Sequence, residues 1–199
     1  MTTADQKEVA PLPTRKVPTR DRINEAALEL FGAQSYGTTT LQEIADKLGL
    51  TKAALYYYYN TKDELLEEVC GPFLDGFEHI VVHEENQPRT SKTPETLLYA
   101  VAEHFLGKRE LVMLLCFDRS VEGHPVKQRT HNLLNRVEDL LAGPAPDQER
   151  KIRASAAYGA VILPVLQLPE DFLSLQSAAT TITNAALAAL AQPAQLPSP

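Results

Sequence analysis

The stretch TLQEIADKLGLTKAALYYYYNTKDELL, residues 40–66, decides the fold class of its part of the chain. Thr40 followed three residues later by Glu43 is a capping box, which predicts that a helix begins directly after Thr40. Gly49 supplies the left-handed residue that ends this helix, and Thr51 caps the next one. Two short helices joined by a turn that contains glycine are typical of a helix-turn-helix. The alternative is an ordinary helical hairpin.

Four consecutive tyrosines at residues 56–59 follow the turn, and helical geometry divides them. Each residue of a helix is rotated by about 100° from the one before it. Tyr58 and Tyr59 come three and four residues after Leu55 and therefore share its face. This face continues the apolar side of the preceding helix, so we expect both rings to hold the second helix of the motif against its domain.

The other two tyrosines share a face with residues that suit DNA. Lys52 pairs with Tyr56, and Ala53 with Tyr57, at a spacing of four residues. A lysine can neutralise a phosphate, a hydroxyl can bond a phosphate oxygen, and a tyrosine ring can pack on a sugar or a thymine methyl group. The small side chain of Ala53 would let DNA come close. The alternative is that Tyr56 and Tyr57 only cover the first helix of the domain.

Helical periodicity recurs through the rest of the chain, which predicts an all-α protein of about nine helices. The first two helices are expected over residues 20–33 and 41–48, and two more after Thr51 and Thr61. The later helices are expected near residues 95–106, 109–120, 125–142, 147–166 and 170–191. Prolines mark an extended leader over residues 1–18 and a loose tail over residues 192–199.

The net charge of −7 is distributed unevenly over the 199 residues. Residues 1–62 hold 8 Lys and Arg against 7 Asp and Glu, whereas the remainder holds 11 against 19. A basic run, TRKVPTRDR (14–22), beside an acidic body favours local contact with phosphates over a general attraction to nucleic acid. The alternative is a solvated tail.

Composition and missing motifs exclude several classes of protein. The two cysteines, Cys70 and Cys116, form neither a disulfide framework nor a Cys-x-x-Cys zinc pattern. No apolar run reaches the length of about 18 residues of a membrane span, and the N-terminus has no apolar signal region. We therefore expect a cytoplasmic protein that makes no membrane contact.

Catalytic and metal sites are not expected either. The chain has no G-x-S-x-G motif, P-loop or Rossmann fingerprint, so we expect no enzyme activity and no cofactor. His79 and His83 lie four residues apart with Glu84 next to them, which is the spacing of a metal pair. No third ligand accompanies them, so we expect no metal. Cys116 lies in an apolar run and is expected to be inert packing.

Residues 26–66, AALELFGAQSYGTTTLQEIADKLGLTKAALYYYYNTKDELL, resemble the DNA-binding domain of TetR/AcrR-type (tetracycline-repressor-like) transcriptional regulators, and the likeness covers about residues 20–68. It is carried by Phe31, Gly37, Thr40, Ile44, Ala45, Gly49, Leu55, Tyr56 and Lys62. The chain departs from the family pattern at Ala53, where glycine is frequent, and at Tyr58 and Tyr59, which replace a common His-Phe pair.

The resemblance implies a set of DNA-facing residues and a second subunit. The DNA-facing set is Thr40, Thr51, Lys52, Ala53, Tyr56, Tyr57 and Lys62. It also implies two domains, a three-helix helix-turn-helix domain over residues 19–64 and a helical ligand-binding and dimerisation domain over residues 65–191. In a homodimer the two recognition helices would lie about 34–36 Å apart and read a palindrome in double-stranded DNA.

A cavity for an unknown, largely apolar small-molecule effector is implied within the second domain. The candidate residues are Phe77, His104, Phe105, Met113, Phe117, Leu134, Tyr158 and Ile162. The alternative is that these side chains are core, because pockets and cores use the same apolar residue types. His104 and Tyr158 are favoured because each adds a polar tip to an apolar body.

The last two helices are rich in alanine, which lets helices approach each other closely, and the resemblance implies that they pair with a second subunit. The expected dimer contacts are Ala157, Val161, Leu175 and Ile182. We therefore expect a dimeric one-component repressor that binds a palindromic operator and is released by an effector. The alternative is a DNA-binding protein of the same type that is controlled by a protein partner.

Overall fold

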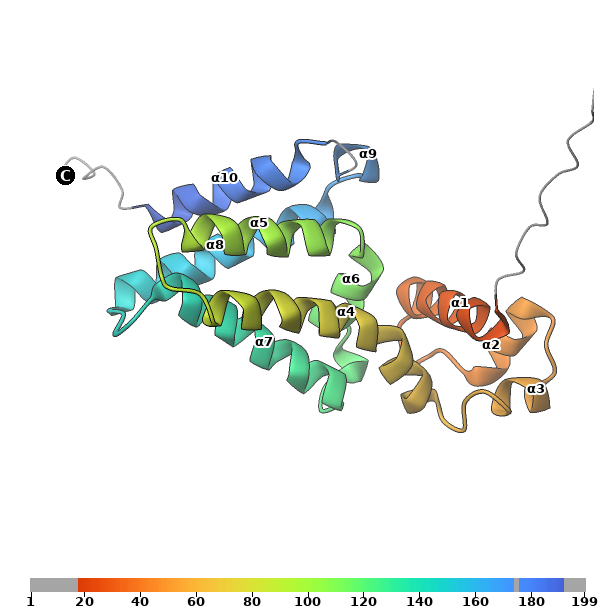
Figure 1. Cartoon of the computed structure of the whole chain (residues 1–199). Helices are drawn as coiled ribbons and strands as arrows, with labels where there is room; N and C mark the ends of the chain where they lie inside the picture. The colour runs from red at the N-terminus through yellow and green to blue at the C-terminus, as the bar shows by residue number, and fades with distance from the viewer. Residues whose placement is uncertain (1–17, 174–175, 192–199) are drawn as a thin grey trace, which may run out of the picture.

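The computed structural model describes residues 18–173 and 176–191, and within them it contains helices and no strand. A small head is formed by α1 (Thr19–Gln34), α2 (Leu41–Leu48) and α3 (Lys52–Tyr56). The helix α4 (Lys62–Glu85) leads from the head into a larger body (Figure 1). The predicted leader, apart from Pro18, and the predicted tail lie outside the described residues.

The body is a bundle of helices built on the second half of α4. Its remaining elements are α5 (Thr93–Leu106), α6 (Arg109–Phe117), the 3-10 turn η1 (Arg119–Val121), α7 (Pro125–Ala142), α8 (Gln148–Gln167), α9 (Glu170–Leu173) and α10 (Ala178–Leu190). Helix α10 packs against α8 and α5, while α7 packs against α4 and α8. The predicted all-α fold, with an N-terminal helix-turn-helix domain and a C-terminal helical domain, is confirmed.

Two predicted helices differ in the structure. The last one, expected over residues 170–191, is divided into α9 and α10 because residues 176 and 177 form a turn, so the described residues hold ten α-helices. The sixth, expected over residues 109–120, ends at Phe117. The carboxylate of Asp118 accepts the N–H of Ser120 and starts η1, which competes with continuation of the helix.

Helix α4 is shared by the head and the body. It is one helix of 24 residues, so the predicted domain boundary between residues 64 and 65 lies inside it. Its first turns contact α1, whereas Phe73 and Phe77 lie in the core of the body. Pro72 stands between these two parts of the helix.

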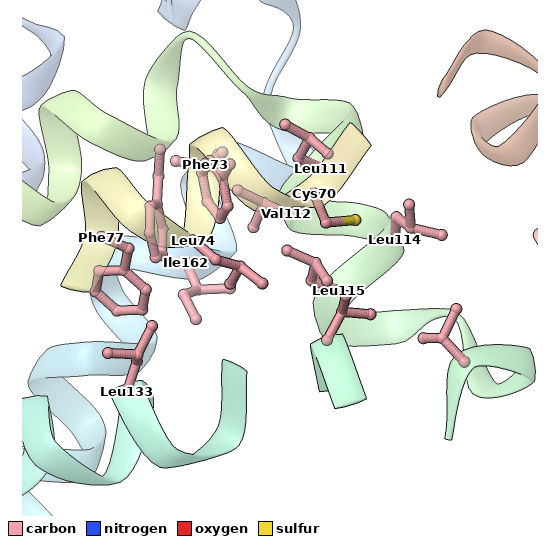
Figure 2. Close-up of a cluster of buried hydrophobic side chains, with 14 of the residues drawn as sticks. Cys70, Phe73, Leu74, Phe77, Leu111, Val112, Leu114, Leu115, Leu133 and Ile162 are labelled. Carbon is pink, nitrogen blue, oxygen red and sulfur yellow. The ribbon is translucent and has the colours of Figure 1, made fainter. Parts of the chain in front are cut away.

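Apolar side chains of α4 meet those of three other helices inside the body. Figure 2 shows this cluster, which includes Cys70, Phe73, Leu74, Phe77, Leu111, Val112, Leu115, Leu133 and Ile162. The four residues from α4 fall at i, i+3, i+4 and i+7, which is one face of a helix. Burial of this apolar face stabilises the bundle.

Charged side chains along α4 and α7 join the two helices outside the core. Arg129 pairs with Asp75 at 2.8 Å and also contacts Glu78, and Arg136 donates to Glu85 at 2.8 Å. Exposed ion pairs contribute little stability individually. Their spacing along both helices nevertheless favours one register between α4 and α7.

Candidate nucleic-acid interface

The helices α2 and α3 begin and end at the capping residues that the sequence predicts. The Oγ1 atom of Thr40 accepts the N–H of Glu43 at 3.2 Å, and the N–H of Thr40 donates to the Glu43 carboxylate at 2.7 Å. Gly49 has φ of 65° and ends α2. The Oγ1 atom of Thr51 accepts the N–H of Ala54 at 3.1 Å and starts α3. These local contacts fix the angle between α2 and α3.

The four tyrosines are divided as predicted. Tyr59 is only 2% exposed, and its hydroxyl donates to Asn24 Oδ1 of α1 at 2.6 Å. The guanidinium of Arg20 lies over its ring, 5.1 Å from the centroid. Tyr58 is half-buried and packs against the same core. Tyr59 therefore fastens the end of α3 to α1.

Tyr56 and Tyr57 point outward, with 41% and 85% of their surfaces exposed. The Lys52 ammonium lies 5.6 Å from the centroid of the Tyr56 ring, which keeps a positive charge on this face. The ring of Tyr57 meets the edge of Tyr58 at 5.2 Å between centroids, which supports it from one side. One face of α3 thus combines a cation with two phenol hydroxyls.

Six of the seven predicted DNA-facing residues are exposed: Thr40, Thr51, Lys52, Ala53, Tyr56 and Tyr57. The seventh, Lys62, differs. Its ammonium donates to the carbonyl oxygens of Tyr36 at 2.7 Å and Thr39 at 2.8 Å and lies 4.2 Å from the centroid of the Tyr36 ring. Burial lowers the pKa of Lys62, against the effect of the neighbouring carboxylates. In this structure Lys62 is turned toward the head and supports the turn between α1 and α2.

Known proteins resemble the chain most clearly in this region. A sequence profile of the bacterial regulatory proteins of the tetR family matches residues 23–69. The HTH-type transcriptional regulator SrpR of Pseudomonas putida is 49% identical over 51 residues, which are 26% of this chain and 24% of SrpR. Residues 23–69 are therefore similar to the DNA-binding domain of TetR-type regulators.

Further comparisons extend the likeness to the TetR-type fold. The HTH-type transcriptional repressor KstR2 of Mycolicibacterium smegmatis is 32% identical over 63 residues, 32% of this chain and 31% of that protein. The chain spans less than half the length of the curated relatives it matches. The structure of the ketosteroid transcriptional regulator KstR2 of Mycobacterium tuberculosis superposes with a TM-score of 0.70 at 16% identity, covering 88% of this chain and 95% of that one. Its likeness shows that the TetR-type architecture extends through the body.

The effector-site residues predicted from the TetR-type pattern lie in three different environments. Phe77, Phe105 and Ile162 are buried in the core. His104 lines a groove of about 350 Å³ between α1, α4 and the start of α6, where its Nε2 atom donates to the Phe73 carbonyl at 2.9 Å. Three of the predicted pocket residues are therefore packed in the core, whereas His104 faces a groove.

The remaining predicted pocket residues lie on α6, α7 and α8. Met113 and Phe117 are exposed and line a second groove of about 300 Å³ against the end of α1. Tyr158 of α8 has a buried hydroxyl with no hydrogen-bond partner among the described residues, and Leu134 of α7 is half-buried.

Burial raises the pKa of Cys116 to about 11, which disfavours a reactive thiolate and agrees with inert packing.

Three of the predicted dimer contacts are covered within the chain itself. Ala157, Val161 and Ile182 are buried within a single chain, because α8 and α10 pack against each other. Small residues permit this close approach inside one subunit as readily as between two. Leu175 lies outside the described residues. On α8 and α10, only residues other than these three are therefore open to a partner.

Across residues 18–173 and 176–191, no group of three His, Cys, Asp or Glu side chains is arranged to hold a metal ion, and His79 and His83 gain no third ligand. Over the same ranges, none of the helices has the length and apolar character needed to cross a bilayer.

The sequence did not predict the contacts of the turn between α1 and α2. The Tyr36 hydroxyl donates to Asp63, its ring lies under Lys62, and its N–H donates to Asp118 of the body. These partners are separated by 26 to 82 positions along the chain, so no local pattern connects them. The signal that pointed to the turn was Gly37, which belongs to the family pattern.

Proposed function

We propose that the chain is a homodimeric transcriptional repressor that binds a palindromic operator in the cytoplasm and is released from it by a small, largely apolar effector. The observation that carries the proposal is the exposed face of α3, where Lys52, Tyr56 and Tyr57 stand beside the buried anchor Tyr59. A cation neutralises phosphate, while hydroxyls and rings reach phosphates and base edges. The matched relative KstR2, named a repressor, supports the direction of control.

A second subunit would dock on the outer faces of α8 and α10. On α8, Ile152 and Leu163 are exposed and lie eleven residues apart, which places them three turns apart on one face. On α10, Ala185 and Ala188 are exposed and small. An apolar stripe of this kind would be covered by the same stripe of a second copy in a two-fold symmetric contact.

The proposal is tested by selecting bound DNA from a random pool and measuring affinity for the selected sequence. Replacing Lys52 and Tyr57 together by alanine should lower that affinity by more than tenfold, since both contacts with DNA are lost. The slope of log affinity against log salt should also fall by about one for the lost lysine.

The chain provides a matched control on the body. Lys92 and Tyr99 are the same two residue types, partly or fully exposed, near the start of α5 and on it. Replacing both by alanine should leave DNA binding unchanged. Equal affinities of the two double variants would refute the assignment of α3, and a wild-type protein that selects no DNA would refute the function.

A protein partner in place of the small effector is the second candidate. The observation that favours it is the pair Met113 and Phe117, which are exposed four residues apart on α6. This candidate predicts that extracts containing the partner displace the wild-type protein from its operator but not a variant with serine at both positions. A small molecule that displaces both proteins equally would contradict it.

A further inference from the structure

The connection between α6 and α7 contacts the head at the turn between α1 and α2. The N–H of Tyr36 donates to Asp118 Oδ2 at 2.7 Å, and the N–H of Gly37 donates to Ser120 Oγ at 2.7 Å. Both acceptors belong to the body and both donors to the head. We call these four residues the latch.

The latch is built so that each acceptor is already oriented. The other oxygen of Asp118, Oδ1, accepts the backbone N–H of Ser120 at 2.8 Å and its hydroxyl at 2.6 Å. The Ser120 hydroxyl therefore donates to Asp118 and accepts from Gly37 at the same time. Burial raises the pKa of Asp118, but the hydrogen bonds from Ser120 and Tyr36 outweigh it and bring the pKa below its usual value. The carboxylate stays charged and keeps accepting.

Gly37 allows the two backbones of the latch to come this close. A Cβ atom at this position would lie 2.7 Å from Ser120 Cβ, which is shorter than real contacts between carbon atoms. The need for glycine here comes from the approach of the body, since Gly37 does not have positive φ. Any side chain at position 37 would push the body away from the turn.

The body side of the latch is anchored in the core. Lys127 of α7 is only 4% exposed, and its ammonium donates to the carbonyl oxygens of Leu115 at 2.9 Å and Cys116 at 3.0 Å. These are terminal carbonyls of α6, which lack partners within the helix. Asp118 follows Cys116 by two residues, so α6 and α7 together fix its position.

The turn is held from α4 as well, but through different atoms. Lys62 donates to the carbonyl oxygens of Tyr36 and Thr39, whereas the latch takes the N–H groups of Tyr36 and Gly37. The turn is thus held both from the first residue of α4 and from the connection between α6 and α7, which gives it a defined orientation. The helix α2 follows this turn directly and carries α3 with it.

We propose that Asp118 and Ser120 are positioning residues that set the orientation of the DNA-binding head and thereby the half-site spacing that a dimer accepts. This inference rests on the proposed function as a dimeric DNA-binding protein. In a dimer, two heads of fixed orientation match one separation of half-sites, whereas loosened heads accept several. Neither residue needs to touch DNA for this effect.

The test uses four DNA fragments derived from the selected operator. Three are palindromes whose central spacer is unchanged, one base pair longer or one base pair shorter, and the fourth is a single half-site. We expect the wild-type protein to prefer one spacing clearly. With Asp118→Ala and Ser120→Ala combined, the affinity for that palindrome should fall by about tenfold, as two hydrogen bonds are lost. Affinity for the half-site should change by less than twofold, and the three spacings should become similar.

Two further variants separate positioning from a general loss of folding. Gly37→Ala displaces Ser120 from the other side of the contact and should give the same loss of spacing preference. Asp139→Ala with Ser91→Ala, at exposed positions of the body, should behave as wild type. Circular dichroism checks that each variant is folded, and Ser120→Ala alone, with an expected loss of about threefold, serves if the double variant unfolds.

The outcomes are distinguishable. If the folded variants keep the wild-type spacing preference, or lose affinity for the half-site and the palindrome equally, the positioning role is overturned while DNA binding stands. If the wild-type protein binds neither palindrome nor half-site, the proposed function fails first and the positioning role with it.

Discussion

Replacing Tyr59 by phenylalanine removes one hydroxyl from the interior of the head and leaves the ring in place. This hydroxyl donates to Asn24 Oδ1 at 2.6 Å, and the Tyr59 side chain is only 2% exposed. The net contribution of such a hydrogen bond is about 1 kcal/mol. For a protein of this size, a loss of this amount lowers the melting temperature by roughly 2–4 °C. We expect this shift for Tyr59→Phe.

The matched substitution is Tyr57→Phe, two residues earlier. The side chain of Tyr57 is 85% exposed, so loss of its hydroxyl should change the free energy of unfolding by less than about 0.5 kcal/mol. Thermal and urea unfolding, followed by far-UV circular dichroism, compare both variants with the wild-type protein. In the folded state, operator binding should show the opposite ranking, with Tyr57→Phe weakened more than Tyr59→Phe.

The result that refutes this reasoning is an inverted or absent difference in stability. If Tyr57→Phe unfolds at a lower temperature than Tyr59→Phe, the division of the four tyrosines between core and surface is wrong. If both variants are as stable as the wild-type protein, the contact between Tyr59 and Asn24 does not hold α3 to α1.

Three other predictions concern acid stability, the subunit contact and the ends of helices. Asp118 has a folded-state pKa below its usual value of 3.8, so its charged form stabilises the fold above that pH and this contribution is lost as the pH falls through the folded-state pKa. Urea midpoints measured between about pH 5 and pH 3 should therefore fall less steeply for Asp118→Asn than for the wild-type protein. Ile182→Asp should lower the unfolding temperature strongly because it buries an unpaired charge, whereas Leu163→Asp should stay folded and sediment as a monomer; a dimeric Leu163→Asp would move the contact elsewhere. Gly49→Ala should destabilise the protein by about 1 kcal/mol because φ at this position is 65°. Gly32→Ala, inside α1 with open space around it, should stabilise the protein by roughly 0.5–1 kcal/mol. Chemical denaturation that gives both changes the same sign would contradict this explanation.

Features set by neighbours in the sequence could be predicted from the sequence. The capping box at Thr40, the left-handed Gly49 and the division of the tyrosines depend on contacts within a few residues, and the structure has all three. Lys62 could not be placed in the same way. Its partners, Tyr36 and Thr39, lie more than 20 positions away, and an exposed lysine at the start of a helix has the same local pattern.

The sequence also could not predict which surfaces cover the apolar residues of the body. A run of small and apolar residues, such as the one around Ala157 and Ile182, packs equally well within a chain and between chains. The apolar run of α6 does not indicate which side is covered: Met113 and Phe117 face outward, while Leu114 and Leu115 face inward. Only the arrangement of α1, α7 and α8 around α6 decides which side is covered.

The head meets the body through α4, through the packing of α1 on α6 and through the latch. In α4, Pro72 has no N–H to donate, so the carbonyl of Glu68 lacks the usual helical partner four residues later. The latch is short, and Lys127 anchors the end of α6 that precedes it. We therefore expect bending of α4 to concentrate at Pro72, whereas a displacement of α6 would reach the head directly through the latch and through α1.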